Sequence, residues 1–380
     1  MKIAVLKETL AGEARVALIP DSVKRLVKKG FAVSVQAGAG DRSGFADQDF
    51  EKVGAEIVTD PVAMCSAADL VIKVQPPSPE EIKLCREGAA LISILQPYLR
   101  HETVQQLADR RLSAFALDTI PRTTLAQSMD VLSSMSTIAG YKAVLMAANS
   151  LNKFFPMLMT AAGTVRPAKV LVLGAGVAGL MACATAKRLG AVVEAFDVRP
   201  VVKEQVQSVG AKFVEVPVEE SGEGDGGYAK EMSDDYKRKQ GELIAKHIAK
   251  SDVVIPTALI PGKKAPILIS EEMVQSMGAG SVIVDLAAEM GGNCELTEPG
   301  ETVVKHGVII VGPDNIPSTV PFHASQMFAK NIEKFLFHLA GDEGLKMDMD
   351  DEITKGSLIT HDGKVVQEMT LKIMNEAGGN

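Results

Sequence analysis

Hydrophobic residues between positions 1 and 116 follow two alternating patterns. Short and nearly continuous apolar runs predict strands that are buried on both faces. These runs are Lys2–Leu6, Ala32–Val35, Leu70–Val74, Ala90–Leu95 and Ser113–Ala116. Between them, apolar residues with helical spacing occur at Asp21–Lys29, Pro79–Arg86 and His101–Arg110. Strands that alternate with helices predict a βα series and a parallel sheet.

A second series of the same kind follows a helical stretch at 128–153. Its predicted strands begin at Val170 and continue at Val192–Phe196, Phe213–Val216, Val253–Ile255, Ser281–Asp285 and Val308–Val311. The predicted helices are Glu204–Val209, Asp234–Ala249 and Ala324–Leu339, the last of which we expect to return to the first domain. We therefore predict an α/β protein of two Rossmann-like domains with parallel sheets. The second domain, 134–320, is inserted into a first domain made of 1–133 and 321–380.

A glycine-rich turn opens the second series. Gly174, Gly176 and Gly179 follow a predicted strand with Gly-x-Gly-x-x-Gly spacing, and the next strand ends at Asp197. In this pattern the first glycine permits a tight turn, the second lets backbone N–H groups approach a pyrophosphate, and the third lets a helix pack closely on the sheet. A carboxylate about 20 residues further on accepts the ribose 2′-OH of NAD and repels the 2′-phosphate of NADP. The inserted domain is therefore predicted to bind NAD(H).

Composition narrows the function classes. The chain has 380 residues, a formal net charge of -8 and no basic stripe with interleaved aromatic residues, which argues against a nucleic-acid surface. The four cysteines have neither metal-ligand spacing nor a pairing pattern. We therefore expect a protein of a reducing cytoplasm, with no metal site and no membrane-spanning segment of its own.

Two further segments have local signatures. Ser357–Val366 alternates around Asp362-Gly363, which predicts a β-hairpin that lies either on a neighbouring chain or on its own domain. Glu219–Glu231 is rich in glycine, and its length is typical of a lid or of a disordered connector. In the lid interpretation, Tyr228 offers a flat hydrogen-bonding surface that closes on the nucleotide.

Six stretches carry a family resemblance that extends over most of residues 1–340. Three of them resemble the superfamily that joins alanine dehydrogenase to proton-translocating transhydrogenase, and they are Lys7–Pro20, Thr257–Pro266 and Asp285–Asn293. The other three resemble specifically the NAD(H)-binding component of transhydrogenase, known as domain I, and they are Arg122–Ser134, Met159–Val165 and Gly226–Met232.

The two branches of this superfamily need different chemistry. Alanine dehydrogenase couples hydride transfer to proton transfer, and that family uses a lysine and a histidine for substrate binding and acid–base work. At the matching places this chain has Gln75 and Gln96. An alignment shifted by two residues would instead bring Lys73 to the lysine position, so a self-contained alanine dehydrogenase remains an alternative.

Direct hydride transfer between two nicotinamide rings requires position rather than a proton acceptor. The reacting carbons must be held about 3 to 3.5 Å apart, and water must be excluded. The resemblance implies that Arg122, Gln127, Asp130 and Ser133 surround the nicotinamide of NAD(H) and fix it by hydrogen bonds. From their spacing alone, Gln127, Asp130 and Ser133 would equally cap or solubilise one face of a helix.

The same resemblance, together with the glycine pattern, assigns the other cofactor contacts. The predicted cofactor-binding residues are Thr123, Thr124, Gly174, Gly176, Val177, Gly179, Asp197, Val198, Arg199, Gly227, Tyr228, Thr257, Ala258 and Leu259. Among them, Gly227 and Tyr228 would form a mobile loop. Arg199 is either a solvated charge or stacks on the adenine. Outside this set, Glu13 and Arg15 either serve a cleft of the first domain or form a structural ion pair.

The function that the resemblance implies is one half of a hydride exchange. The chain would hold NAD(H), while a partner subunit holds NADP(H) and a membrane subunit carries the proton path. The resemblance also implies a homodimer that docks on the cytoplasmic face of the inner membrane, with the other components in separate polypeptides. Besides the alanine dehydrogenase, a non-catalytic NAD-sensing module is the other alternative.

Overall fold

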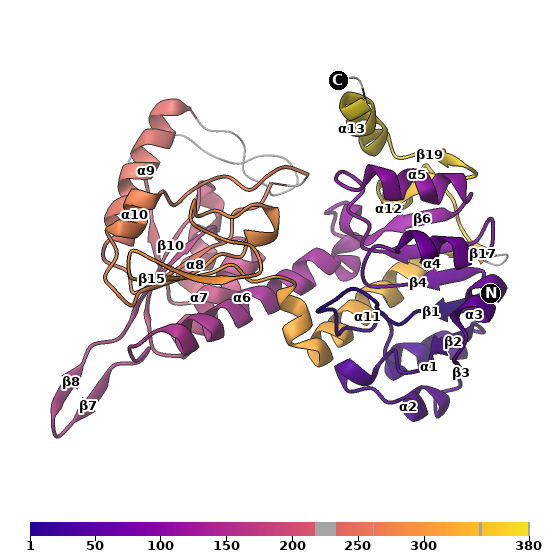
Figure 1. The fold of residues 1–380 in the computed structure, drawn as a ribbon, viewed down its shortest axis with the longest axis horizontal. Helices are drawn as coiled ribbons and strands as arrows, with labels where there is room; N and C mark the ends of the chain where they lie inside the picture. Colours follow the sequence, from indigo (N-terminus) through magenta and orange to yellow (C-terminus); the bar gives the residue numbers. More distant parts are fainter. Residues whose placement is uncertain (217–232, 261, 342–343, 379–380) are drawn as a thin grey trace. The chain divides into compact units, whose positions relative to one another are not determined.

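The computed structural model describes residues 1–216, 233–260, 262–341 and 344–378, and it divides into two compact units (Figure 1). The first unit comprises residues 1–135 and 317–380, and the inserted unit comprises residues 136–316. The predicted domain boundaries differ from these by a few residues. The predicted fold class is confirmed, since each unit is an α/β structure around one large and mainly parallel sheet.

The sheet of the first unit has eight strands in the order β19-β18-β6-β5-β4-β1-β2-β3. Strands β1 to β6 run parallel to their neighbours, and β18 pairs with β6 in the antiparallel direction. The strands are β1 (Lys2–Val5), β2 (Ala32–Gln36), β3 (Glu56–Val58), β4 (Leu70–Ile72), β5 (Ala90–Ser93), β6 (Ser113–Ala116), β18 (Leu358–His361) and β19 (Lys364–Val365), beside a small pair β16 (Ala340–Gly341) and β17 (Gly344–Leu345). The helices are α1 (Pro20–Lys28), α2 (Asp47–Glu51), α3 (Pro61–Ala67), α4 (Pro79–Leu84), α5 (His101–Asp109), α11 (Pro321–Leu339), α12 (Glu352–Ser357) and α13 (Glu368–Gly378).

Local sequence explains several of these elements. Helix α4 begins with a capping box, in which Ser78 and Glu81 satisfy each other's backbone N–H groups. The predicted C-terminal hairpin is present as β18 and β19, and both turn residues, Asp362 and Gly363, have the positive φ angles that this turn requires. Because β18 pairs with β6, the hairpin extends the sheet of its own unit.

The sheet of the inserted unit has seven strands in the order β11-β10-β9-β12-β13-β15-β14, of which β14 alone is antiparallel to its neighbour. The strands are β9 (Lys169–Leu173), β10 (Val192–Phe196), β11 (Lys212–Val214), β12 (Val253–Pro256), β13 (Val282–Val284), β14 (Thr302–Lys305) and β15 (Val308–Val311). The helices are α7 (Val177–Arg188), α8 (Lys203–Ser208), α9 (Asp234–Ile248) and α10 (Glu271–Gln275). The chain order along this sheet matches that of a dinucleotide-binding α/β fold.

Two apolar clusters cover the two faces of this sheet. On β9, Val170 and Val172 pack in the cluster that includes Ala182 of α7. The alternate residue Leu171 packs in the other cluster, together with Ile244 of α9. Alternation along a strand therefore buries both faces, as expected for a parallel sheet between two helical layers.

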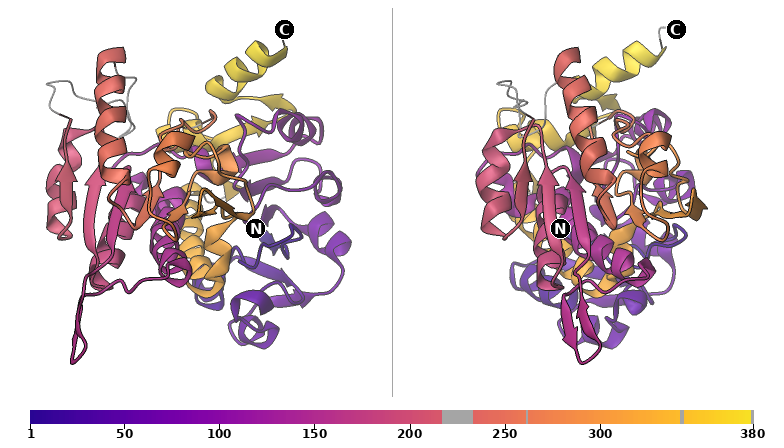
Figure 2. Two further views of the ribbon diagram at one scale, coloured as in Figure 1. Left: turned by 60° about the vertical axis from the view of Figure 1, so that its left-hand side comes forward. Right: turned by 90° about the vertical axis from the view of Figure 1, so that its left-hand side faces the viewer.

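Two elements of the inserted unit differ from a minimal α/β layer. A hairpin of β7 (Leu158–Thr160) and β8 (Gly163–Val165) extends away from the body of the unit (Figure 2). The division between the units falls within α6 (Val131–Ser150). Within the described ranges, α6 is the one helix long and apolar enough to cross a membrane, a criterion that core helices also meet.

Candidate functional site

The glycine turn lies at the carboxyl end of β9, directly before α7. Gly174 has a φ of +101°, and a Cβ atom added to it would lie 2.5 Å from Thr257 Oγ1. A Cβ atom at Gly179 would lie 1.8 Å from the Gly174 carbonyl oxygen. Both glycines are therefore required by close packing within the turn, as the sequence pattern predicts.

The middle glycine faces open space instead. The nearest atom to a Cβ added at Gly176 is Arg199 Nη2, at 4.0 Å. Gly176 is the N-cap of α7, and no side chain among the described residues caps this helix. The first turn of α7 thus offers uncapped N–H groups beside an open glycine, which fits the pyrophosphate of a dinucleotide.

Other predicted cofactor residues gather at the same edge of the sheet. Asp197, Val198 and Arg199 follow β10, and Thr257, Ala258 and Leu259 follow β12. Strands β10 and β12 are the two neighbours of β9. Because the chain order reverses between β9 and β12, this edge is the topological switch point, where open α/β sheets bind ligands.

Asp197 holds the turn through its carboxylate. Its Oδ2 accepts a hydrogen bond from the Ala175 N–H at 2.7 Å, and Arg199 Nη2 lies 2.8 Å from the same oxygen. Its Oδ1 accepts from both the backbone N–H and Nε of Arg199, each at 2.9 Å. Hydrogen bonding to Asp197 raises the pKa of Arg199 further above its usual range. Arg199 is thus paired with the carboxylate and is not a solvated charge.

The segment after β12 is fixed by two residues outside the predicted site. Thr257 Oγ1 donates to the Gly174 carbonyl, and the fully buried Asn293 grips Ala258 with its Oδ1 accepting from the backbone N–H and its Nδ2 donating to the carbonyl, both at 2.9 Å. Asp285, also fully buried, accepts from the backbone N–H of Asn293 at 2.8 Å. An aspartate and an asparagine after an apolar strand are the sequence signal that could have indicated this clamp.

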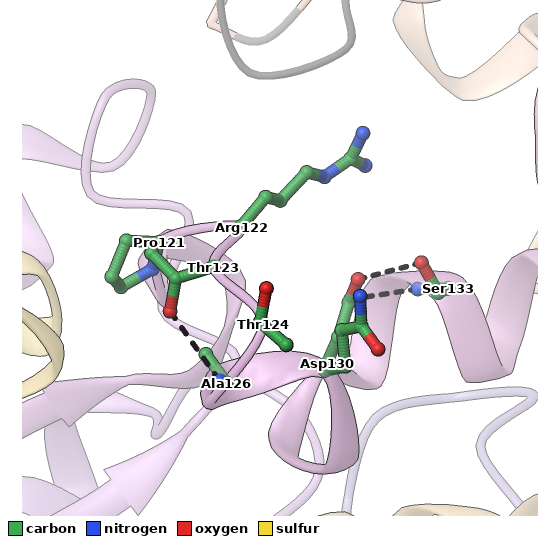
Figure 3. Close-up of a pocket in the computed structure, with 8 residues that line it drawn as sticks. Pro121, Arg122, Thr123, Thr124, Ala126, Asp130 and Ser133 are labelled. Carbon is green, nitrogen blue, oxygen red and sulfur yellow. Dashed lines mark hydrogen bonds between the residues drawn. The ribbon is translucent and has the colours of Figure 1, made fainter.

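The first unit contains a cavity of about 440 Å³ that brings six predicted residues together. Its lining consists of Pro121, Arg122, Thr123, Thr124, Ala126, Gln127, Asp130 and Ser133. Arg122 extends outward from the 121–124 segment, and Asp130 and Ser133 face each other at the start of α6 (Figure 3). No lysine, histidine, cysteine or tyrosine is among these lining residues.

Asp130 and Ser133 form a helix cap. Asp130 Oδ1 accepts the Ser133 backbone N–H at 2.8 Å, and its Oδ2 accepts the Ser133 hydroxyl at 2.6 Å. Gln127 lies in a separate short 3₁₀ helix, η3 (Ala126–Met129), so the three polar residues do not share one regular helix. Asn331 of α11 donates to the Ser128 carbonyl at 2.9 Å and so ties η3 to its own unit. Capping of α6 and lining of the cavity are therefore compatible roles for Asp130.

The polar residues near β4 form a buried network. Arg15 makes a bidentate ion pair with Glu13, at 2.8 and 2.6 Å, and Gln75 Nε2 donates to Glu13 Oε2 at 2.8 Å. Burial raises the pKa of Glu13, but hydrogen bonds from Arg15 and Gln75 outweigh it and lower the pKa to about 2. Of the two interpretations that the sequence allowed for Glu13 and Arg15, the structural ion pair is the one observed. Lys73 is buried beside Glu81, with 2.5 Å between Nζ and Oε1.

Three predictions concern residues or groups of another kind. Gly227 and Tyr228, predicted as a mobile loop, lie outside the described residues. All four cysteines are free and buried. In the described ranges, no group of three or more histidine, cysteine or acidic side chains is arranged to hold a metal ion.

Comparisons with known proteins agree with the resemblance. Residues 4–139 match the family model "Alanine dehydrogenase/PNT, N-terminal domain", and residues 143–368 match "Alanine dehydrogenase/PNT, C-terminal domain". In Rhodospirillum rubrum, the first of the polypeptides that make up NAD(P) transhydrogenase subunit alpha is 50% identical over 375 residues, covering 96% of this chain and 98% of that protein.

A solved structure and a more distant relative mark the two branches. The crystal structure of transhydrogenase from Sinorhizobium meliloti is 45% identical with a TM-score of 0.86, covering 97% of this chain and all of that one. Alanine dehydrogenase of Bacillus subtilis is 32% identical over 378 residues, covering 97% of this chain and 93% of that enzyme. The chain therefore belongs to the alanine dehydrogenase/PNT family and, within it, to the branch of NAD(P) transhydrogenase alpha subunits.

Proposed function

We propose that this chain holds NADH for direct hydride transfer to NADP⁺ on a partner subunit. The observation that carries the proposal is the cavity of the first unit, whose lining can donate and accept hydrogen bonds but has no group suited to acid–base work near neutral pH. Its carboxylate, Asp130, is engaged by Ser133. Such a lining suits a reaction that depends on position alone.

In the proposed complex, the inserted unit binds most of the dinucleotide. Backbone N–H groups at Gly176 and Val177 receive the pyrophosphate, and Asp197 receives the adenosine ribose. The other proposed contacts are Gly174, Gly179, Val198, Arg199, Thr257, Ala258 and Leu259, with Gly227 and Tyr228 in a loop that closes over the cofactor. NADH supplies the hydride, and the chain binds and orients it.

The residues of the cavity have a positioning role in this proposal. Arg122, Gln127, Asp130 and Ser133, with Thr123 and Thr124 beside them, hydrogen-bond the carboxamide and ribose of the nicotinamide half. Fixing the ring matters because hydride transfer requires the two reacting carbons about 3 to 3.5 Å apart. Exclusion of water from the ring keeps the hydride from side reactions.

An alanine dehydrogenase activity is less well supported. Such a reaction needs a lysine and a histidine that exchange protons with the substrate, and Gln75 and Gln96 stand at the matching places. The nearby Lys73 is buried and bonded to Glu81, so it is already committed to structure. These contacts favour the transhydrogenase branch.

The proposal includes partners. We infer a homodimer that works with an NADP(H)-binding subunit and with a membrane subunit through which hydride transfer is coupled to proton translocation. The chain would then be peripheral to the cytoplasmic face of the inner membrane. Residues 134–320 would be the NAD(H)-binding domain, and 1–133 with 321–380 the alanine dehydrogenase/transhydrogenase-type domain. The names of the relatives as alpha subunits support the need for partners.

The test mixes the purified chain with a purified NADP(H)-binding transhydrogenase subunit and follows transfer from NADH to an NADP⁺ analogue of distinct absorbance. We expect transfer that requires both proteins. The NADP(H) subunit combined with its own NAD(H) subunit is the positive control. If that control is active and the mixture with this chain is not, the proposal is wrong.

A further inference from the structure

The carboxylate of Asp197 has its acceptor positions filled by the protein itself. Four N–H groups point to its two oxygens, namely the Ala175 backbone N–H and the backbone N–H, Nε and Nη2 of Arg199. A carboxylate has roughly four lone-pair sites, so little acceptor capacity is left for another donor. Ribose hydroxyls therefore have to displace a bond that already exists.

Of these four donors, only the two from the Arg199 side chain can leave without unfolding the turn. The backbone N–H groups of Ala175 and Arg199 are fixed by the chain path through the glycine turn and the end of β10. The Arg199 side chain is 17% exposed, whereas that of Asp197 is 5% exposed. The guanidinium is thus the accessible member of the pair, and it lies between Asp197 and solvent.

The same guanidinium lies beside the place proposed for the pyrophosphate. Arg199 Nη2 is the nearest atom to a Cβ position at Gly176, at 4.0 Å, and Gly176 caps the N-terminus of α7. A dinucleotide phosphate at this helix end would come within reach of Arg199. The arginine therefore has two possible anionic partners, one in the protein and one in the ligand.

We propose that Arg199 is a specificity-determining residue that exchanges partners when nucleotide binds. Its guanidinium leaves Asp197 for the pyrophosphate, and the ribose hydroxyls take the released positions on the carboxylate. The inference rests on the proposed NAD(H) site and adds a rule for what that site accepts. A ligand with ribose but no phosphate must break the Asp197–Arg199 ion pair without replacing it, so the site selects for the diphosphate.

The rule is tested by calorimetric titration of the full chain with adenosine, ADP and NADH. In R199A the carboxylate is free, so adenosine binds more tightly, whereas ADP and NADH lose a charged partner and bind more weakly. We expect the ratio of the adenosine Kd to the ADP Kd to fall by about tenfold or more, as for loss of one charge-assisted hydrogen bond. R199K keeps the charge but not the planar fork, so adenosine binding should tighten while ADP binding stays within about threefold.

The matched control is R238A. Arg238 also pairs with two carboxylates, Asp235 and Glu242, but it lies on the exposed face of α9. We expect the affinity ratio to stay unchanged in R238A. If R199A proves unstable, R199Q and R199K are measured in its place, since either frees some of the acceptor positions on the carboxylate.

The outcomes separate this inference from the proposed function. An unchanged ratio in folded Arg199 variants overturns the exchange, even if the wild-type chain binds NADH and transfers hydride. An equal loss of adenosine and ADP affinity also overturns it, because that result indicates stacking of Arg199 on the adenine. If the wild-type chain binds neither ADP nor NADH, the proposed function fails and the inference fails with it.

Discussion

The two units of this protein share a strand order but differ at the edge of the sheet where ligands bind. The parallel strands lie in the order β3-β2-β1-β4-β5-β6 in the first unit and β11-β10-β9-β12-β13-β15 in the inserted unit. In each unit the order reverses beside the first strand of the series, between β1 and β4 or between β9 and β12. Both units therefore have a topological switch point of the same kind.

The residues that follow those strands are of opposite character. In the inserted unit, glycines leave an open helix end beside β9. In the first unit, Glu8 follows β1 and Lys73 follows β4, and both are buried. Glu8 accepts the Val74 backbone N–H at 2.6 Å, and Lys73 bonds to Glu81. Strand order thus provides a crevice, and the turn residues decide whether it is open to a ligand or filled by charged side chains.

The largest expected effect comes from breaking the charged cluster of the first unit. K73A leaves Glu8 and Glu81 without their buried cation, and we expect a loss of about 3 to 5 kcal/mol in the free energy of unfolding. K24A, at an exposed position of α1, should change stability by less than about 0.5 kcal/mol. Denaturant titration measures both. If K73A were as stable as K24A, the cluster would have no structural role.

The same cluster predicts a pH dependence that the inserted turn lacks. Burial raises the pKa of Glu8 from its ordinary 4.5 to about 7, and the charge of Lys73 offsets only some of this effect. A raised pKa stabilises the folded state fully below pH 4.5, and this stabilisation is lost as the pH rises through 7. At about 1.36 kcal/mol per unit, the loss amounts to about 3 kcal/mol.

Unfolding curves between pH 5 and 8 would show this dependence, and E8Q should flatten it. Glu13, whose pKa is held at about 2, stays ionised over the whole range and adds no slope. An E8Q protein whose stability still falls with rising pH as steeply as that of the wild type would contradict the assignment to Glu8.

In the inserted unit, the open turn is broken by one methyl group. The Cβ of G179A would lie 1.8 Å from the Gly174 carbonyl oxygen, so the turn must shift. We expect a loss of about 1 to 3 kcal/mol in stability, and at least tenfold weaker NADH binding because the helix end moves. G241A in α9, where a Cβ meets no atom within 4 Å, is the matched control and should leave NADH binding unchanged. Fluorescence titration with NADH distinguishes the two, and equal affinities would show that the glycine turn is not the binding site.

The sequence predicted those regions of the fold that depend on local patterns. The alternating series, the glycine turn and the Asp362-Gly363 hairpin follow from periodicity and from positive φ angles. Elements such as β3 and α3 are short and partly exposed, so their apolar pattern is too weak to detect. The β7–β8 hairpin was also absent from the predicted elements, because its strands are short and mostly exposed.

The site was predictable only as far as chemistry shows in single residues. The pattern indicated Asp197 as a carboxylate at the right position, but not that Arg199 occupies both of its oxygens. The grip of Asn293 on Ala258 joins residues 35 positions apart, and such a contact depends on the packing of two strands. Likewise, the cap between Asp130 and Ser133 emerges only once α6 begins at Val131.

The central claim is that the chain positions a nicotinamide ring and does no acid–base work, and Q127A in single-turnover kinetics tests it most directly. NADH is saturating, the NADP(H)-binding subunit is present with an NADP⁺ analogue, and the NADH Kd is measured on the same samples. The account predicts a hydride-transfer rate reduced by about tenfold or more, with the Kd within about threefold of wild type. An unchanged rate in Q127A, or reduction of NAD⁺ by L-alanine with the chain alone, would contradict it.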